Sequence, residues 1–381
     1  MNFRLSFWFF ATGMLFLASA CKQNTEKVKT DGEQYEIYYK PTFSKRFIIE
    51  ANGDDKRLVV YNPWQGSRDV KFTYTLTHDK SKDAHTVKIP VERVICLSST
   101  HLAFVDFIDE IDKVAGVSGA GFISNQRARQ LIADGQIADV GYESYLSYEV
   151  IATLKPDVVF AYGVDGELGK TEAKLNEMGI KLVYIGEYLE ETPLARAEWA
   201  VAIAAFFEKS EIAAEKVKNI ENEYNQLKNI AAHVADKPKV LINAPYRDVW
   251  YLPAVKSTAI NFLKDAGGEY IFEAETQNTK ESNPTNIEYV YIKALNADIW
   301  INQNNETSLA QLKNLDVRLI NIAAFKNKTV YNNNNQLTPN GGNDFWESGV
   351  INPQIILKDL IKIFHPQLLP EHQLFYYRKL E

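Results

Sequence analysis

The chain has 381 residues, of which 46% are hydrophobic and 24% charged, and its formal net charge is −7. At about 150 residues per domain, that length indicates two domains or lobes with hydrophobic cores of ordinary size. Acidic residues outnumber basic ones and no basic stripe occurs, which argues against nucleic acid as a partner because phosphate binding draws on clustered positive charge. The six histidines and two cysteines are scattered, so we expect no metal site of the usual zinc spacing and no cofactor.

Residues 1–20 are typical of a secretory signal peptide. Arg4 precedes an apolar run, LSFWFFATGMLFLASA, that is shorter than the ~20 apolar residues a bilayer core requires. The run ends in LASA before Cys21, and this order resembles the bacterial lipobox; an ordinary cleavage site with a chance cysteine is the alternative. We expect an envelope lipoprotein that is anchored to the inner or outer membrane through Cys21 and faces the periplasm. Residues 21–34 are polar and are predicted to form a flexible tether.

Residues 35–90 are predicted to form a β-rich N-terminal extension. Aromatic and β-branched residues alternate or cluster in four segments, which are separated by turn signals such as the Asn-Gly pair at 52–53. The four segments are 35–39, 47–49, 57–61 and 70–76. A small antiparallel sheet is the expected result.

From residue 91 short apolar strands alternate with helices, which indicates an α/β fold. Strands are predicted at 94–97, 113–117, 158–161, 182–185, 239–243, 249–252, 298–302, 317–322 and 329–331. Helices are predicted at 193–207, 211–235, 259–266, 287–295 and 353–364. The helix at 211–235 contains no Gly or Pro and would be about 37 Å long. The expected fold is two Rossmann-like α/β lobes, residues 91–208 and 237–381, joined by one long interlobe helix within residues 209–236.

Segments of both lobes resemble the periplasmic substrate-binding proteins of cobalamin and ferric-siderophore ABC importers. They are RVICLSS at 93–99, VAGV at 114–117, DVG at 139–141, LKPDVV at 154–159, the helix at 214–232 and the Gly pair at 267–268. The resemblance covers about residues 91–366 and implies a class III periplasmic-binding-protein-like fold, in which one stiff helix limits movement between two clamping lobes. It also implies that Glu149 and Glu288 dock onto basic residues of the membrane permease. Favourable interaction with helix dipoles is the alternative role for both glutamates.

The resemblance places the ligand between the lobes, at the carboxyl ends of the strands. Aromatic faces with a few hydrogen-bond donors suit a large flat chelate, although packing or capping is the alternative role for each side chain. Arg127 and Arg247 are expected to pair with an anionic chelate, and His101, Tyr142 or Tyr145 could ligate a haem iron. The predicted ligand-binding residues are Ser99, His101, Arg127, Tyr142, Tyr145, Tyr162, Tyr246, Arg247, Trp250, Asn343 and Trp346.

The function that these features favour is the substrate-binding lipoprotein of an ABC importer, a monomer that hands a metal chelate to the permease. A ferric siderophore is the first expected substrate class, cobalamin the second and haem the third. A surface chelate-binding module that is not coupled to transport is the alternative. An enzyme is not expected, because the sequence has no Gly-x-Ser-x-Gly elbow, paired-carboxylate signature or phosphate-binding glycine loop.

Overall fold

The computed structural model describes residues 35–79, 83–142, 145–163, 168–279 and 282–381. The predicted signal peptide at 1–20, the tether at 21–34 and the predicted lipidation site Cys21 lie outside these residues. Within the described ranges, no helix combines the length and the apolar character that crossing a membrane requires.

The N-terminal extension is a five-stranded sheet whose strands follow one another in chain order. They are β1 (Glu36–Tyr39), β2 (Phe47–Asn52), β3 (Asp55–Tyr61), β4 (Lys71–Thr77) and β5 (Thr86–Lys88). The first four are antiparallel neighbours as predicted, but β5 is an additional strand that pairs parallel to β4. The Glu198 carboxylate accepts the backbone N–H groups of Thr42, Phe43 and Ser44, which ties the extension to the α/β part of the chain.

The next sheet, which we call the N-terminal sheet, is wholly parallel and has the strand order β10-β9-β6-β7-β8. Its strands are β6 (Val94–Cys96), β7 (Val114–Val117), β8 (Ala138–Asp139), β9 (Val158–Ala161) and β10 (Leu182–Tyr184). The helices of this part are α1 (Ser99–Phe107), α2 (Gln126–Ala133), α3 (Tyr148–Leu154) and α4 (Leu168–Glu177). All residues of β6, β7, β9 and β10 are buried, as expected for parallel strands covered on both faces.

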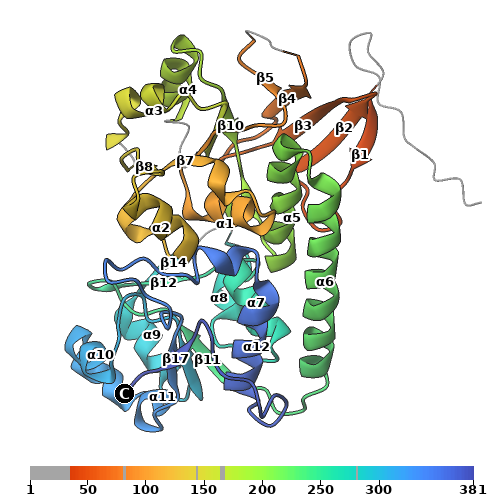
Figure 1. The fold of residues 1–381 in the computed structure, drawn as a ribbon. Helices are drawn as coiled ribbons and strands as arrows, with labels where there is room; N and C mark the ends of the chain where they lie inside the picture. Colours follow the sequence, from red (N-terminus) through yellow and green to blue (C-terminus); the bar gives the residue numbers. More distant parts are fainter. Residues whose placement is uncertain (1–34, 80–82, 143–144, 164–167, 280–281) are drawn as a thin grey trace, which may run out of the picture.

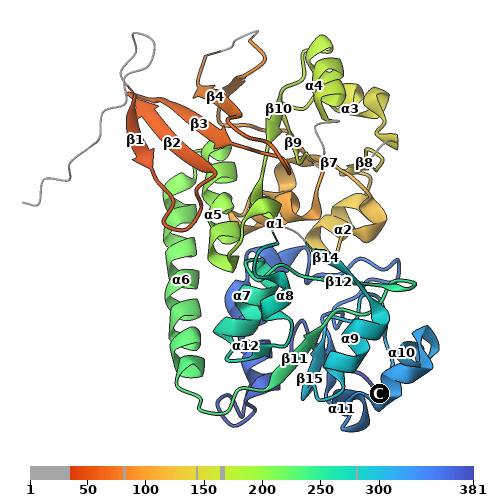
Figure 2. The ribbon, with the colours of Figure 1, turned by 180° about the vertical axis from the view of Figure 1, so that it is seen from behind.

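Two helices connect this sheet to the next one: α5 (Pro193–Ala204) and α6 (Ser210–Ala232). Figures 1 and 2 show α6 running alongside both halves of the α/β part. With 23 residues it is about 35 Å long. Its buried residues recur every three or four positions, so one face packs against α5 and α12 while the other faces solvent.

The last sheet, which we call the C-terminal sheet, has the order β13-β11-β15-β16-β17. Its strands are β11 (Lys239–Ile242), β13 (Glu269–Tyr270), β15 (Ile299–Ile301), β16 (Val330–Asn332) and β17 (Arg378–Lys379). A separate antiparallel pair is formed by β12 (Val249–Leu252) and β14 (Asn283–Asn286). The helices are α7 (Thr258–Asp265), α8 (Glu273–Thr276), α9 (Ile287–Ala294), α10 (Leu309–Leu315), α11 (Ala323–Lys326) and α12 (Pro353–Phe364).

One predicted strand of this part is wrong. The apolar segment at 317–322 forms a 3-10 helix, η6 (Val317–Asn321), because the Asp316 side chain caps its first turn by accepting the Arg318 N–H at 2.8 Å. The strand β17 was not predicted, and it adds to the sheet antiparallel to β16.

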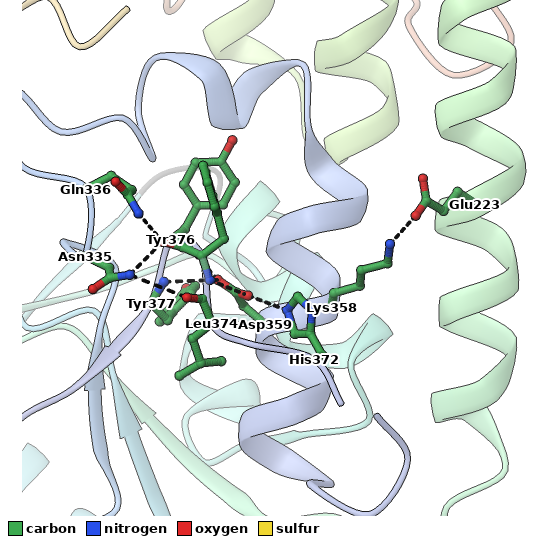
Figure 3. A network of polar contacts seen from close by, with 10 residues as sticks. Glu223, Asn335, Gln336, Lys358, Asp359, His372, Leu374, Tyr376 and Tyr377 are labelled. Atoms are coloured by element: carbon green, nitrogen blue, oxygen red, sulfur yellow. Dashed lines mark hydrogen bonds and ion pairs between the residues drawn. The ribbon is translucent and has the colours of Figure 1, made fainter. Parts of the chain in front are cut away.

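The chain end is held by a buried carboxylate, Asp359 on α12 (Figure 3). It accepts the backbone N–H groups of Phe375, Tyr376 and Tyr377 at 2.7–3.1 Å, and its Oδ1 lies 2.7 Å from His372 Nε2. The neighbouring Lys358 pairs with Glu223 of α6 in the same view. Helix α12 therefore fixes both the C-terminal tail and the position of α6.

Candidate ligand-binding site

A cavity of about 1120 Å³ lies between the N-terminal and C-terminal sheets, and residues from both sides line it. Pockets for drug-sized ligands are typically about 300–1,000 Å³, so this cavity has room for a large ligand. We call it the central cavity.

The wall from the N-terminal side is built at the carboxyl ends of three parallel strands. Ser98 and Ser99 follow β6, Ser118 follows β7 and Tyr162 follows β9. The Ser98 side chain accepts the Thr100 N–H and thereby caps α1, which turns the chain sharply after the strand. Because parallel strands end at one edge of a sheet, these four side chains gather on one side of the central cavity.

The opposite wall is built at the carboxyl ends of three strands of the C-terminal sheet, and asparagines dominate it. Asn243 follows β11, Asn302 follows β15, and Asn333 and Asn334 follow β16. Asn243 and Asn302 have φ angles of +67° and +60°, a left-handed conformation that asparagine tolerates better than most residues. We call the six asparagines of this wall the asparagine cradle: Asn243, Asn302, Asn304, Asn305, Asn333 and Asn334.

The two walls meet at a direct contact between residues 119–125 and the loop at 338–347. The carboxylate of Glu347, whose side chain is only 2% exposed, accepts the backbone N–H groups of Ser124 and Asn125 at 2.8 and 2.6 Å. Burial raises the pKa of Glu347 to about 7, the two backbone bonds oppose this, and the charges of Asp344 and Asp106 add to it. Beside it, Gly342 approaches the Phe122 carbonyl so closely that a Cβ atom would not fit. One edge of the central cavity is therefore shut.

Five of the predicted ligand-binding residues line the central cavity together: Ser99, Tyr142, Tyr162, Asn343 and Trp346. Two of them, Tyr142 and Trp346, are about half exposed, with 49% and 56% of their surfaces accessible. Phe122, which is not among the predicted ligand-binding residues, joins them, and its ring centroid lies 6.4 Å from that of Tyr142. The cavity thus combines aromatic faces with hydroxyl and amide groups.

Two of the predicted residues are buried in the protein core, and their assignment to the ligand site is corrected. His101 is 0% exposed, and its Nδ1 lies 3.2 Å from the Phe160 carbonyl oxygen, because this face of α1 packs on the sheet. Trp250 is also 0% exposed, and its Nε1 donates to the Ile242 carbonyl at 2.9 Å. Neither side chain reaches the central cavity, so His101 does not present a ligand for a haem iron there.

Four further predicted residues are exposed but do not line the central cavity. Arg127 pairs with Asp112 at 2.8 Å, and the guanidinium of Arg247 stacks on the ring of Tyr246 with 5.3 Å to its centroid. Tyr145 is 87% exposed. The two arginines that were predicted to pair with an anionic ligand therefore lie outside the central cavity.

Within the described ranges, no group of three or more His, Cys, Asp and Glu side chains is arranged to hold a metal ion.

The asparagine cradle is absent from the predicted ligand-binding residues, most of which are aromatic or basic and which include a single asparagine, Asn343. The sequence does carry a signal for it, because Asn follows directly after the strands ending at Ile242 and Ile301, and the run NNNN occupies 332–335. When a polar residue follows each of several parallel strands, these residues lie together at one edge of the sheet. Such a pattern predicts a shared binding site at that edge.

The two predicted docking glutamates occupy equivalent positions in α3 and α9. Ser147 caps α3 and Asn286 caps α9, and each helix carries its glutamate, Glu149 or Glu288, in the first turn. Both glutamates are exposed, and α3 and α9 lie on the side of the molecule away from α6 in Figures 1 and 2. The backbone N–H of Glu288 and the guanidinium of Arg318, whose Nη1 lies 3.4 Å from Glu288 Oε1, lower the pKa of Glu288.

Comparisons with known proteins agree with this architecture. The family model described as "Periplasmic binding protein" matches residues 94–337, a range that contains strands of both α/β sheets. An uncharacterized lipoprotein of Methanocaldococcus jannaschii is 29% identical over an alignment of 303 residues that covers 77% of this chain and 70% of the relative. The structure of the periplasmic vitamin B12 binding protein of Vibrio cholerae has a TM-score of 0.51 at 15% identity and covers 72% of this chain and 96% of its own. A periplasmic heme binding protein of Pseudomonas aeruginosa has a TM-score of 0.56 at 15% identity, covering 73% and 94%.

Proposed function

The chain belongs to the periplasmic binding protein family, and on that premise we propose that it is the substrate-binding lipoprotein of an ABC importer. In this proposal it binds a metal chelate in the central cavity and delivers it to the permease. The observation that carries the proposal is the cavity itself, which is about 1120 Å³ in volume and is lined from two sheets that are separate along the chain. An enzyme would need reactive groups at such a place, whereas the described lining residues supply amides, hydroxyls and aromatic rings.

The mechanical part of the proposal is a clamp of two lobes, residues 91–208 and 237–381, connected by α6. A single helix of 23 residues that packs on α5 and α12 resists bending more than a flexible linker would. The contact of Glu347 with Ser124 and Asn125 bridges the same two halves. Small movements of the lobes, rather than a wide opening, are therefore the expected motion on ligand binding.

The location that we propose is the cell envelope, with Cys21 lipidated and residues 21–34 acting as a tether. Two observations support this: the lipobox-like order before Cys21 and the lipoprotein name of the relative in Methanocaldococcus jannaschii. The monomeric state is likewise part of the proposal.

Delivery to the permease is assigned to Glu149 and Glu288. The two carboxylates are exposed, come from equivalent helix starts and lie on elements on the same side of the molecule. Interaction with the helix dipoles, the alternative role, would affect only the stability of α3 and α9. A docking role instead predicts a loss of transport without a loss of ligand affinity.

The experiment is an uptake assay in a strain that lacks the chromosomal copy of the gene and carries a plasmid copy. Radiolabelled cyanocobalamin and ferrichrome are the probes. The double variant Glu149→Ala, Glu288→Ala should bind the probe as the unchanged protein does but should lose uptake. Glu215→Ala, which removes an exposed carboxylate on α6, is the matched control and should keep uptake.

Unchanged uptake by the double variant would overturn the docking assignment. Binding without uptake by the unchanged protein would instead favour a surface chelate-binding module that is not coupled to transport.

A further inference from the structure

The central cavity is electrically neutral along its described surface. None of the described residues that line it is an Asp, Glu, Lys, Arg or His. Two basic side chains line adjoining spaces. Arg196 lines a small cavity of about 60 Å³ that shares Asn302 and Trp346 with the central cavity, and the exposed Arg129 lines a cavity of about 230 Å³ that shares Asn340 with it. Burial lowers the pKa of Arg196, and the negative charges of Glu187 and Glu190 oppose that effect, whereas Arg196 Nε has no hydrogen-bond partner. An anionic ligand would lose its hydration in the central cavity without gaining a counter-charge from the described residues that line it.

The asparagine cradle supplies amide groups whose orientation is set by bonds to the protein. Asn302 Oδ1 accepts the hydroxyl of Tyr377 at 2.8 Å, which directs the Asn302 nitrogen, a donor, to other partners. Asn243 Nδ2 donates to the Tyr251 carbonyl at 2.8 Å, which leaves its oxygen as an acceptor. Each asparagine side chain offers one acceptor and two donors in total. The cradle therefore presents fixed donors and fixed acceptors side by side, and amide groups on a ligand would match both kinds.

Two adjacent members of the cradle have polar atoms that the protein does not satisfy. Asn333 and Asn334 are 3% and 2% exposed, and neither Asn333 Nδ2 nor Asn334 Oδ1 has a hydrogen-bond partner. Other polar groups of these two residues do have partners. Asn334 Nδ2 donates to the Glu306 carbonyl, and the backbone carbonyl of Asn333 accepts from Asn343 Nδ2. A buried polar atom without a partner destabilises the folded protein. An unsatisfied donor and an unsatisfied acceptor on consecutive residues of this wall are the two kinds of group with which a ligand carboxamide can pair.

We propose that the central cavity selects an electrically neutral chelate whose rim carries amide groups, and that Asn333 and Asn334 bind one of those amides. The aromatic side chains Phe122, Tyr142 and Trp346 supply contact area for the rest of a large ligand. This inference rests on the proposed function, because it names the class of chelate. It differs from the expectation that Arg127 and Arg247 pair with an anionic chelate, and it keeps neutral ferric siderophores within the proposed class.

The test is isothermal titration of the purified protein with four probes of known charge. Cyanocobalamin and the ferric trihydroxamate ferrichrome are neutral and carry amides, whereas the tris-catecholate ferric enterobactin and haem are anionic. At least one neutral probe should bind, and neither anionic probe should. The affinity of the neutral probe should change less than about twofold between about 50 and 500 mM NaCl, because salt screens only interactions between charges.

One variant tests the cradle, a second tests the cavity loop beside it, and a third is a control. Asn333→Leu replaces the unsatisfied amide by an apolar group of similar size, so the thermal midpoint of the free protein should stay the same or rise while affinity for the neutral probe falls at least about tenfold. A purely structural role would lower the midpoint and affinity together. Asn340→Ala changes an exposed residue of the cavity loop, so it can be measured even if Asn333→Leu does not fold. Its loss of affinity for the neutral probe should be smaller than that of Asn333→Leu. Asn225→Leu, on the exposed face of α6, is the control.

The possible results separate the inference from the proposed function. Binding of an anionic probe in preference to both neutral ones would overturn the inference and leave chelate import standing. Unchanged affinity in Asn333→Leu and Asn340→Ala would overturn the role of the asparagine side chains. Binding of none of the four probes would overturn chelate binding itself.

Discussion

Replacing Glu347 by glutamine should change how the stability of the protein depends on pH. The Glu347 carboxyl is 2% exposed and bridges the two halves by accepting the N–H groups of Ser124 and Asn125. Burial raises the pKa of Glu347 from 4.5 to about 7. The two hydrogen bonds from the backbone lower this pKa, and the negative charges of Asp344 and Asp106 raise it further. A carboxyl group with a raised pKa stabilises the folded state below the pKa of the unfolded chain, and this contribution is lost as the pH rises through the folded pKa.

The size of the effect follows from the two pKa values. Each unit of difference between the folded and unfolded pKa values corresponds to about 1.4 kcal/mol. The free energy of unfolding should therefore fall by about 3 kcal/mol as Glu347 ionises. Most of that loss, about 2–3 kcal/mol, falls between about pH 5 and pH 8. Glu347→Gln cannot ionise, so its stability should lack this decline, whatever constant cost the amide introduces.

The assay is urea unfolding of the unchanged protein and of Glu347→Gln at several pH values in that range, followed by circular dichroism. The difference in unfolding free energy between the variant and the unchanged protein should grow with pH in favour of the variant. Glu371→Gln, at an exposed residue of the C-terminal tail, controls for the loss of one carboxylate. Parallel pH profiles of the unchanged protein and Glu347→Gln would refute the argument that this carboxyl is buried with a raised pKa.

Three further predictions concern packing and burial. Gly342→Ala should lower the free energy of unfolding in urea by about 1–3 kcal/mol, because the added Cβ would overlap the Phe122 carbonyl. An unchanged urea midpoint would mean that the loop at 338–347 does not pack against the Phe122 backbone. Asp359→Asn should lose about 3 kcal/mol or more, because one acceptor oxygen of the network in Figure 3 becomes a donor facing backbone N–H groups; a loss below about 1 kcal/mol would contradict that network. The thiol of Cys96 should react with Ellman's reagent only after unfolding, because Cys96 is buried and burial raises its pKa; rapid reaction of the native protein would contradict this.

The elements that the sequence predicts well are those whose pattern is local. Helix α12 has the predicted bounds, 353–364, because Pro353 can only begin a helix and the apolar residues behind it recur with helical spacing. The strands β6, β9 and β15 are apolar runs too short to be helices. The segment at 317–322 was predicted as a strand from the same kind of run, and there the Asp316 cap decides the conformation instead.

The elements that the sequence does not predict depend on contacts between distant residues. The strand β17 exists because Asp359, on a helix that ends well before it, fixes the tail beside β16. No propensity of Arg378 and Lys379 indicates this pairing.

The predicted ligand-binding residues also divide into those that a local pattern identifies and those whose position depends on contacts with distant residues. The rule that ligands lie at the carboxyl ends of parallel strands selected Ser99 and Tyr162, which do line the central cavity. The rule says nothing about which way a side chain points, so it also selected His101, whose ring turns into the core. It did not exclude Arg127, because only the structure shows that the guanidinium pairs with Asp112 instead of reaching the cavity.

The central claim, that a chelate binds between the two halves of the chain, is tested most directly by tryptophan fluorescence. Trp346 lines the central cavity and is 56% exposed, whereas Trp250 is buried in the core. Titration with ferrichrome or cyanocobalamin should therefore quench the emission in a saturable way at micromolar or lower concentration, and metal-free ferrichrome should not. The quenching should be largely lost in Trp346→Phe and retained in Trp250→Phe. Absence of saturable quenching by either chelate, or quenching of equal size in Trp346→Phe, would contradict a ligand site in this cavity.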